Sequence, residues 1–510
     1  MSAIVILGHS GSGKTSVGAW VAKCLDIPIA FMIFLLLTSC SDVSEGKSRY
    51  INSDSIEVKF EGGAGRVSGS MSILLIDGKQ WMVDCGAFYP EIGSTAEERQ
   101  QKADEKTANI SDELIDVDGI LLTHAHLDHI GRLPLLVREG YAGPVYATGP
   151  TIALSKTMLT MQIRYESSRN RRWVWSKKSY SKGYIKAHWN NKCDWIHKIH
   201  SSNRKTYTGT IGDLESYLHS KDIDISPCKV CAQIEVAPVM NLMIELDLDS
   251  KLTLSDSVTL KSINAGHIPG SCSFIFELEK VEEKNIKILF SGDLGSPHSA
   301  IIEGPSIAES CDFIIAECTY GCTPTKFNPE EELLHFRRSI AETVNNGGVA
   351  WIPAFALDRS QKVLHQIREL QKNGMIEEDV PIFMPSPTAN SVSKIYRDGR
   401  LKGWFRNNWE KDLSNLYPPG LQTKWVDIEE DILPRPSILI TTSGMMERAF
   451  SENLLDKLLP NAEVSVLLVG YQDPFSPGGI LEKMSGEPVD SGAILNLSKE
   501  KQAISVRAEI

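Results

Sequence analysis

A chain of 510 residues is long enough for two or three domains, and its 42% hydrophobic and 23% charged residues are ordinary for a folded globular protein. The net charge of −12 argues against indiscriminate binding to polyanions, so a nucleic-acid partner would need a local basic patch. The ten cysteines are scattered, which favours reduced intracellular residues over a disulfide framework.

Residues 1–26 contain a nucleotide-binding pattern. A short apolar strand leads into Gly8–Thr15, which reads G-x-x-x-x-G-K-T, and an amphipathic helix pattern follows. In such a loop backbone N–H groups cradle phosphates, the lysine meets the β and γ oxygens and the threonine holds Mg²⁺. The candidate ligands of ATP and Mg²⁺ are Gly8, Gly13, Lys14 and Thr15. The stretch resembles the opening of a P-loop kinase without its further strands, so a leftover fragment is the alternative.

Residues 27–55 begin with an apolar run, 27–37, that is too short to span a bilayer. The run resembles the core of a signal peptide with a lipoprotein-type cleavage box, which would make Cys40 an acylated membrane anchor. The favoured alternative is a buried apolar segment in a cytoplasmic protein. Residues 41–55 are polar and are predicted to form a linker.

The strongest pattern is Thr123–His129, in which three histidines and an aspartate fall within six residues. It follows a buried-strand pattern, 117–122, and precedes a helix pattern, 130–137. On a tight loop at a strand end these imidazoles and the carboxylate converge, as a pair of divalent, zinc-like ions requires. By contrast, the polar and charged residues 89–113 predict a surface loop.

This run resembles the metal-binding loop of the metallo-β-lactamase superfamily. Three further stretches resemble that family, namely 81–86 (WMVDCG), 265–271 (AGHIPGS) and 290–293 (FSGD). The resemblance implies an αββα sandwich over residues 56–321 that binds two zinc ions.

The resemblance also implies roles for single residues. The implied ligands are His124, His126 and His267 for one zinc ion, and Asp128 and His129 for the other, with Asp293 bridging the two. Asp84 would orient the metal loop from behind. Two such ions provide hydroxide at neutral pH and clamp the scissile phosphate.

Residues 163–207 form a predicted insertion in which twelve lysines and arginines are met by only two acidic residues, with tyrosines and tryptophans between them. Cations that track phosphates and rings that stack on bases suit single-stranded RNA. A helical lid with a solvated basic face is the alternative. In and after the insertion a separate zinc site, or an accidental grouping, could be formed by Cys193, His197, His200, Cys228 and Cys231.

From residue 322 to the end, strand and helix patterns alternate, which predicts an inserted doubly wound α/β domain. Four stretches resemble the β-CASP branch of the superfamily, the RNA- and DNA-processing nucleases: 316–321, 352–359, 442–446 and 469–472. The resemblance implies that Glu317 orients a ligand imidazole. The residues implied to contact substrate are Arg359, Ser443, Gly444 and Met445.

One departure from the family pattern concerns the end of the sequence. β-CASP nucleases return to the first sandwich through a Ser-x-His-x-Asp segment and supply a later histidine, whereas no histidine follows His365 here. We therefore expect an incomplete sandwich with an open sheet edge and a second zinc site that lacks a ligand. Cleavage would be weak or absent, because a positioned general acid contributes about 10²–10⁴-fold.

Together these patterns predict a zinc-dependent phosphodiester hydrolase that cuts single-stranded RNA by metal-hydroxide attack. Its candidate catalytic carboxylates are Asp84, Asp128, Asp293 and Glu317. One alternative is a non-catalytic RNA-binding or scaffold subunit, in a homodimer or with a partner nuclease. The others are a hydrolase of small esters or thioesters and an ATP-dependent kinase acting through Lys14.

Overall fold

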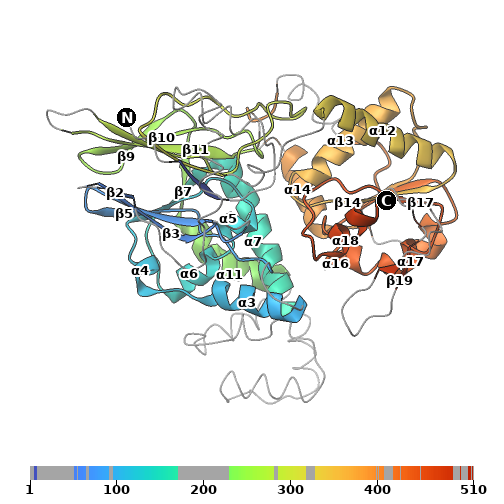
Figure 1. Cartoon of the computed structure of the whole chain (residues 1–510), viewed down its shortest axis with the longest axis horizontal. Helices are drawn as coiled ribbons and strands as arrows, with labels where there is room; N and C mark the ends of the chain where they lie inside the picture. Colours follow the sequence, from blue (N-terminus) through green and yellow to red (C-terminus); the bar gives the residue numbers. More distant parts are fainter. Residues whose placement is uncertain are drawn as a thin grey trace, which may run out of the picture.

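In the computed structural model the chain forms two α/β domains that lie side by side (Figure 1). The described residues are 5–8, 51–53, 56–64, 68–90, 96–169, 229–280, 285–317, 328–397, 399, 401, 403–406, 417–424, 427–447, 449–485, 494–495, 504–506, 508 and 510. Several predictions fall outside them, namely those on Gly13, Lys14, Thr15, Cys40 and most of the basic insertion. Of the helices within these residues, none is long and apolar enough to cross a membrane.

The first domain begins with a seven-stranded sheet in the order β2-β3-β4-β5-β6-β7-β8, antiparallel as far as β5 and parallel from β5 to β8. Its strands are β2 (Ile51–Ser53), β3 (Ile56–Gly62), β4 (Met71–Ile76), β5 (Lys79–Val83), β6 (Gly119–Leu121), β7 (Val145–Thr148) and β8 (Met243–Leu246). Successive side chains alternate between its faces. Leu74 and Val83 pack toward the second sheet, whereas Ile73 and Met82 pack with the helices.

The second sheet packs face to face on the first, in the order β1-β13-β12-β11-β10-β9. Its strands are β9 (Lys251–Thr253), β10 (Val258–Asn264), β11 (Cys272–Leu278), β12 (Ile286–Phe290), β13 (Phe313–Glu317) and β1 (Val5–Gly8). Because β9 to β12 are antiparallel and β13 runs parallel to β12, β10, β12 and β13 end at one edge of the sheet. Phe274 and Phe276 fill the space between the sheets.

Strand β1 pairs in parallel with β13, with Gly8 opposite Glu317, so the start of the chain adds a strand beside β13. This pairing joins residues about 300 positions apart in sequence, which no local pattern connects. The open sheet edge that the family pattern implies stays a prediction.

The helices of the first domain lie on the outer face of the seven-stranded sheet (Figure 1). They are α3 (Ala96–Ala108), α4 (Asp112–Ile115), α5 (Leu127–Ile130), α6 (Leu133–Glu139), α7 (Gly149–Arg169) and α11 (Lys229–Leu242). Helix α3 corrects the prediction of a surface loop over 89–113. Its buried positions are Arg99, Ala103 and Thr107, one every fourth residue. This stripe is helical in spacing but polar in composition, so it gave no apolar signal.

The second domain is a doubly wound unit, as predicted. Its sheet is parallel throughout, in the order β15-β16-β14-β17. The strands are β14 (Val349–Pro353), β15 (Ile382–Phe383), β16 (Ser437–Thr441) and β17 (Val464–Val466). Ala350 and Ile352 pack on one face and Val349 and Trp351 on the other, so both faces of β14 are buried.

Helices cover both faces of this sheet. One group is α12 (Pro329–Asn345), α13 (Arg359–Lys372) and α14 (Pro387–Arg397). The other contains α16 (Ala449–Glu452), α17 (Leu455–Leu458) and α18 (Pro477–Met484), with a π-helical turn (Ile428–Ile432) beside it. A two-stranded hairpin, β18 (Ile494–Leu495) and β19 (Ile504–Ser505), packs on the second group.

Among the described residues, several contacts join the two domains. Helix α14 packs along α7. Arg406 reaches the segment after β12, where its Nε donates to Ile302 O (3.1 Å) and its Nη2 to Pro297 O (3.0 Å). The guanidinium of Arg99 on α3 lies over the ring of Phe475, 4.9 Å from its centre. The strand ends of the first domain therefore face the second domain.

Candidate metal centre

The metal loop lies at the edge where the four parallel strands β5 to β8 of the first sheet end. Strand β6 is wholly buried, and His124 and His126 follow it before helix α5 begins at Leu127. Gly86, just after β5, packs so closely on the loop that a Cβ there would lie 1.6 Å from Asp128 O. A glycine is therefore required beside the loop, which Ser70 also holds by donating its N–H to Asp128 O (2.8 Å).

The second sheet brings the remaining site residues to the same edge. His267 follows β10, Asp293 follows β12 and Glu317 ends β13. Gly295 N donates to Ala265 O (2.9 Å), which joins the loop after Asp293 to the loop that carries His267. Residues that are far apart in sequence thus meet because the strands that precede them run in the same direction.

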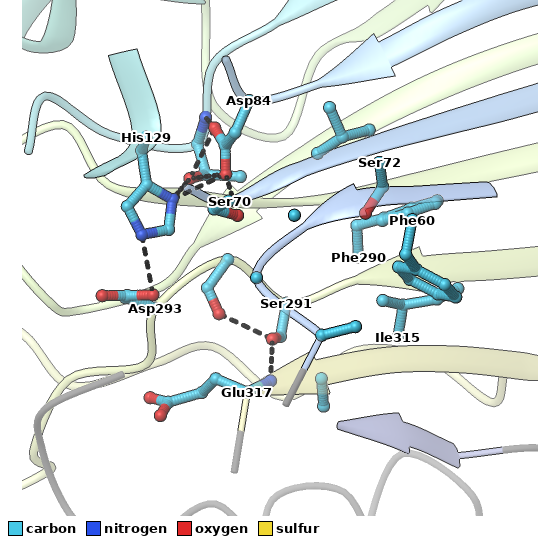
Figure 2. A pocket seen from close by; sticks show the side chains of 17 residues that line it. Phe60, Ser70, Ser72, Asp84, His129, Phe290, Ser291, Asp293, Ile315 and Glu317 are labelled. Atoms are coloured by element: carbon cyan, nitrogen blue, oxygen red, sulfur yellow. Dashed lines mark hydrogen bonds and ion pairs between the residues drawn. The ribbon is translucent and has the colours of Figure 1, made fainter. Parts of the chain in front are cut away.

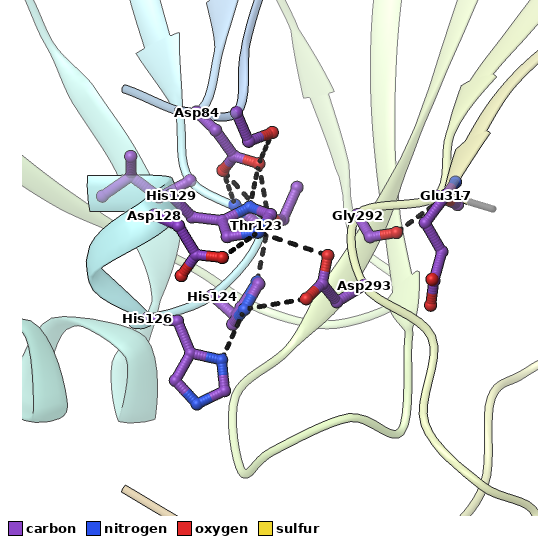
Figure 3. Close-up of polar contacts among 12 residues, drawn as sticks. Asp84, Thr123, His124, His126, Asp128, His129, Gly292, Asp293 and Glu317 are labelled. Carbon is purple, nitrogen blue, oxygen red and sulfur yellow. Dashed lines mark hydrogen bonds and ion pairs between the residues drawn. The ribbon is translucent and has the colours of Figure 1, made fainter. Parts of the chain in front are cut away.

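Four donor atoms form the first group of the site. Figure 3 shows three of the side chains that carry them, His124, His126 and Asp293. His126 Nδ1 lies 3.0 Å from His124 Nε2 and 3.2 Å from His267 Nε2. Asp293 Oδ2 lies 3.7 Å from His124 Nε2 and 3.6 Å from His267 Nε2. A tetrahedral ion with metal–nitrogen bonds of about 2.0–2.1 Å has ligand–ligand distances of about 3.3–3.4 Å. The four atoms, all within 4.8 Å of one another, fit such an ion.

The second group is centred on His129. Its Nε2 lies 3.2 Å from Asp293 Oδ1 and 3.8 Å from Asp128 Oδ2 (Figure 3). Asp293 therefore directs one carboxylate oxygen to each group, which is the arrangement of a bridging ligand. The second group has three donors, against four in the first.

Asp84 orients both the loop and His129. It is buried in a left-handed conformation (φ 62°) directly after β5. Its Oδ2 lies 2.7 Å from His129 Nδ1, and its Oδ1 accepts the N–H of Thr123 (2.8 Å). An N–H at Nδ1 leaves the lone pair of Nε2 free to face the second group.

Sequence reasoning gave Thr123 no role, yet it is part of this network. Its hydroxyl is 2.9 Å from Asp84 Oδ2 and 3.0 Å from His124 Nδ1. It thus connects the carboxylate behind the loop to an imidazole of the first group. Its position directly before the histidine run was the available signal.

Burial and mutual repulsion set the protonation of the first group. Burial lowers the pKa of His267 to about 3, and burial also lowers the pKa values of His124 and His126. Neutral imidazoles present lone pairs at neutral pH, as metal ligands must. Burial alone would raise the pKa of Asp293, but the imidazoles of His129 and His124 hold it well below its usual range.

The second group behaves differently. Burial opposes the charged form of His129, but the carboxylates of Asp293, Asp84 and Asp128 outweigh burial and raise its pKa well above the usual value. Burial raises the pKa of Asp128. In the metal-free protein the proton on His129 thus supplies the positive charge that a bound metal ion would supply.

Glu317 supports the site from the end of β13. Its Oε1 accepts the N–H of Leu294 (3.0 Å), and its own N–H donates to Ser291 Oγ (3.1 Å). These contacts fix the backbone on both sides of Asp293. The expectation that Glu317 also orients an imidazole stays a prediction.

A cavity lies between the two sheets beside the second group (Figure 2). His129, Asp293 and Glu317 form its polar side, and Phe60 and Ile315 lie on its apolar side. The second group therefore borders open space, whereas His124 is buried completely.

The predicted substrate residues lie apart from this cluster, in the second domain. Arg359 begins α13 after β14, and Ser443, Gly444 and Met445 follow β16. Because β14 and β16 are parallel neighbours, both segments lie at one edge of that sheet. Gln472 holds the second segment by donating its side-chain N–H to Gly444 O (3.0 Å). Their contact with substrate stays a prediction.

Comparisons with known proteins agree with this geometry. Residues 65–207 match the metallo-beta-lactamase superfamily, and residues 360–481 match the Beta-Casp domain. The chain belongs to the metallo-β-lactamase superfamily. Within that superfamily the second domain assigns it to the β-CASP branch.

Named relatives point to the same branch. Ribonuclease TTHA0252 of Thermus thermophilus is 26% identical over 81% of this chain and 78% of its own length. Endoribonuclease ysh1 of Schizosaccharomyces pombe is 24% identical over 88% of this chain and 49% of its own length. Transcription termination factor FttA of Methanosarcina mazei is 25% identical over 72% of this chain and 50% of its own length. The chain spans about half the length of the last two.

Proposed function

We propose that this protein hydrolyses phosphodiester bonds of RNA with two zinc ions held at the His/Asp cluster. The observation that carries the proposal is the position of Asp293, whose two oxygens face the two donor groups at 3.2–3.7 Å. A buried carboxylate among imidazoles whose nitrogens converge is explained by a cation between them.

Each residue has a distinct part in the proposed reaction. His124, His126 and His267 would hold the first ion, Asp128 and His129 the second, and Asp293 both. When bound, a pair of zinc ions lowers the pKa of water to about 7 and stabilises charge on the attacking and leaving oxygens. Asp84 keeps His129 in the required tautomer through the 2.7 Å contact to Nδ1.

RNA as the substrate is supported by the names of the relatives, two of which are ribonucleases. Imidazole and carboxylate donors suit zinc, whose usual ligands they are. Single-stranded RNA is the proposed form, because the cations interleaved with aromatic residues in 163–207 suit the phosphates and bases of a single strand. A homodimer, a partner nuclease, a cytoplasmic location and ATP binding at Lys14 are separate proposals that do not affect this one.

A second candidate function is RNA binding without cleavage. The observation that favours it is the difference between the two donor groups, since among the described residues only the first brings four donor atoms together. A protein that retains one zinc ion would bind RNA and turn it over poorly.

The test is cleavage of a labelled single-stranded RNA by the zinc-loaded protein, compared with the His124→Ala variant. His335→Ala, which removes an exposed imidazole on α12, is the matched control. Cleavage by the wild type and the control, lost in His124→Ala and in chelator, supports hydrolysis. Binding of RNA with no cleavage at saturating zinc would reject hydrolysis in favour of the second candidate.

A further inference from the structure

A charged cluster in the second domain lies at the start of α13. Asp358 caps this helix in a left-handed conformation (φ 70°) and is buried. Tyr396 on α14, itself fully buried, donates its hydroxyl to Asp358 Oδ1 (2.9 Å). Lys362, one turn into α13, forms an ion pair with Asp358 Oδ2. Helix α13 and helix α14 thus fix the Asp358 carboxylate with which Lys362 pairs.

A chain of contacts leads from this cluster to the metal centre. The loop that carries His267 ends at Gly270, whose O accepts hydrogen bonds from Thr148 Oγ1 (2.6 Å) and Thr151 Oγ1 (3.0 Å) at the start of α7. Helix α7 packs on α14, which carries Tyr396. In Figure 1, α13 and α14 lie on the side of the second domain that faces the first. The cluster and the His267 loop therefore lie on facing sides of the boundary between the two domains.

Electrostatics agrees with that placement. Burial is the main reason that the pKa of His267 is lowered to about 3, the charge of Lys362 lowers it further, and the charge of Asp358 opposes both. The charge of Asp358 also acts on the pKa of His126. The charged side chains of this cluster therefore lie close enough to the first donor group to change the pKa values of its imidazoles.

The three members of the cluster differ in access to solvent. The side chain of Asp358 is 7% exposed and Tyr396 is buried, whereas the side chain of Lys362 is 28% exposed. Asp358 already accepts from Tyr396, so its charge remains stabilised if the ammonium turns toward a second anion. An ammonium with three donors can contact a carboxylate and a phosphate together.

We propose that Lys362 is a substrate-binding residue that contacts a backbone phosphate of the RNA strand next to the scissile bond, with Asp358 and Tyr396 as its positioning residues. The inference rests on the proposed function for the identity of the ligand. A strand that places one phosphate at the metal centre would have His267 of the first domain on one side and Lys362 of the second domain on the other. A purely structural role, as an ion pair that caps α13, is the competing account.

Salt dependence of RNA binding separates these accounts. Each phosphate contact on a single strand contributes about −0.7 to the slope of log K against log salt concentration. We expect Lys362→Ala to reduce the slope by about that amount and Lys362→Arg to restore it. Lys372→Ala is the matched control, because Lys372 forms an ion pair with Glu369 at the other end of the same helix.

The measurement is fluorescence anisotropy of a labelled single-stranded RNA over a series of KCl concentrations, with chelator present to stop turnover. Lys362→Gln, which keeps the length of the side chain, replaces Lys362→Ala if the latter does not fold. An unchanged slope in Lys362→Gln or Lys362→Ala would overturn the inference even if the zinc enzyme cleaves RNA. A reduced slope without any cleavage by zinc-loaded wild type would overturn hydrolysis and leave the inference standing. Absence of RNA binding by the wild type would overturn both.

Discussion

Two buried aspartates show how the two domains differ. Counted over the whole residue, Asp293 and Asp358 are each 5% exposed. Each follows a strand end in its domain. Asp358 is neutralised within the chain by an ammonium and a phenol. Asp293 is surrounded by imidazoles. In the metal-free first domain the positive charge beside Asp293 comes from His129, whose pKa is raised by the neighbouring carboxylates. A metal ion can replace the proton on that imidazole, whereas the ammonium beside Asp358 belongs to the chain itself, and this contrast is the physical basis for a metal at Asp293.

Replacing the two aspartates tests the contrast most strongly. Asp293→Ala removes a ligand from both donor groups, so we expect RNA cleavage to fall by about 10³-fold or more, in line with several kcal/mol of lost transition-state stabilisation. Asp358→Asn should leave zinc content at the wild-type value. Initial cleavage rates and zinc content of both variants check this. Equal loss of zinc in both variants would break the comparison.

The residue behind the metal loop should give the next largest effect. Asp84→Asn leaves His129 without its carboxylate partner, and we expect zinc affinity or activity to fall by about 10–100-fold. Zinc titration against a competing chelator measures the affinity. Asp77→Asn is the control, because Asp77 is also in a left-handed conformation, outside the site. An Asp84→Asn variant with wild-type zinc affinity would contradict the role of Asp84.

The contacts of Asp358 within the chain lead to a prediction about stability. Loss of its hydrogen bond should lower the free energy of unfolding and leave the zinc content unchanged. Tyr396→Phe removes a hydrogen bond to a charged group, so unfolding free energy should fall by about 1.5–3 kcal/mol. Tyr417→Phe, which removes a 3.4 Å contact to Ser393 O, should lose about 0.5–1.5 kcal/mol. Chemical denaturation measures both. Zinc content that falls together with stability in Tyr396→Phe would show that the cluster supports the metal centre instead.

The last effect concerns a histidine outside the metal centre that is kept neutral mainly by burial. Burial lowers the pKa of His365 on α13 to about 4, below the unfolded value of about 6.5. The unfolded chain binds the proton first on acidification, so this residue costs stability as pH falls from about 6.5 toward 4, by at most about 1.4 kcal/mol per pH unit. His365→Gln should remove that dependence equally with and without chelator, as pH-dependent denaturation can test. A chelator-dependent difference would contradict it.

The His/Asp cluster could be predicted from sequence because its members follow local patterns. His124, His126 and His129 lie within one loop, and His267 and Asp293 each follow a buried strand whose end could be placed. The doubly wound second domain was equally predictable from its alternation of strands and helices. What these features share is that short-range spacing and strand polarity are sufficient to place them.

Other features depend on partners that lie far away in sequence. Pairing of β1 with β13 joins residues about 300 positions apart, and the Tyr396 contact to Asp358 spans two helices. Helix α3 buries Arg99 and Thr107 in its stripe, so its pattern is polar although its spacing is helical. Sequence periodicity detects the apolar face of a single element, and it does not show which distant element that face contacts.

The central claim is that the His/Asp cluster binds two zinc ions through Asp293. Plasma mass spectrometry of the purified chain, with Asp293→Ala beside it, measures this directly as zinc per chain. The account predicts two zinc ions in the wild type and a clear loss in the variant. A wild type without zinc after zinc loading, or a variant that retains the wild-type amount, would contradict it.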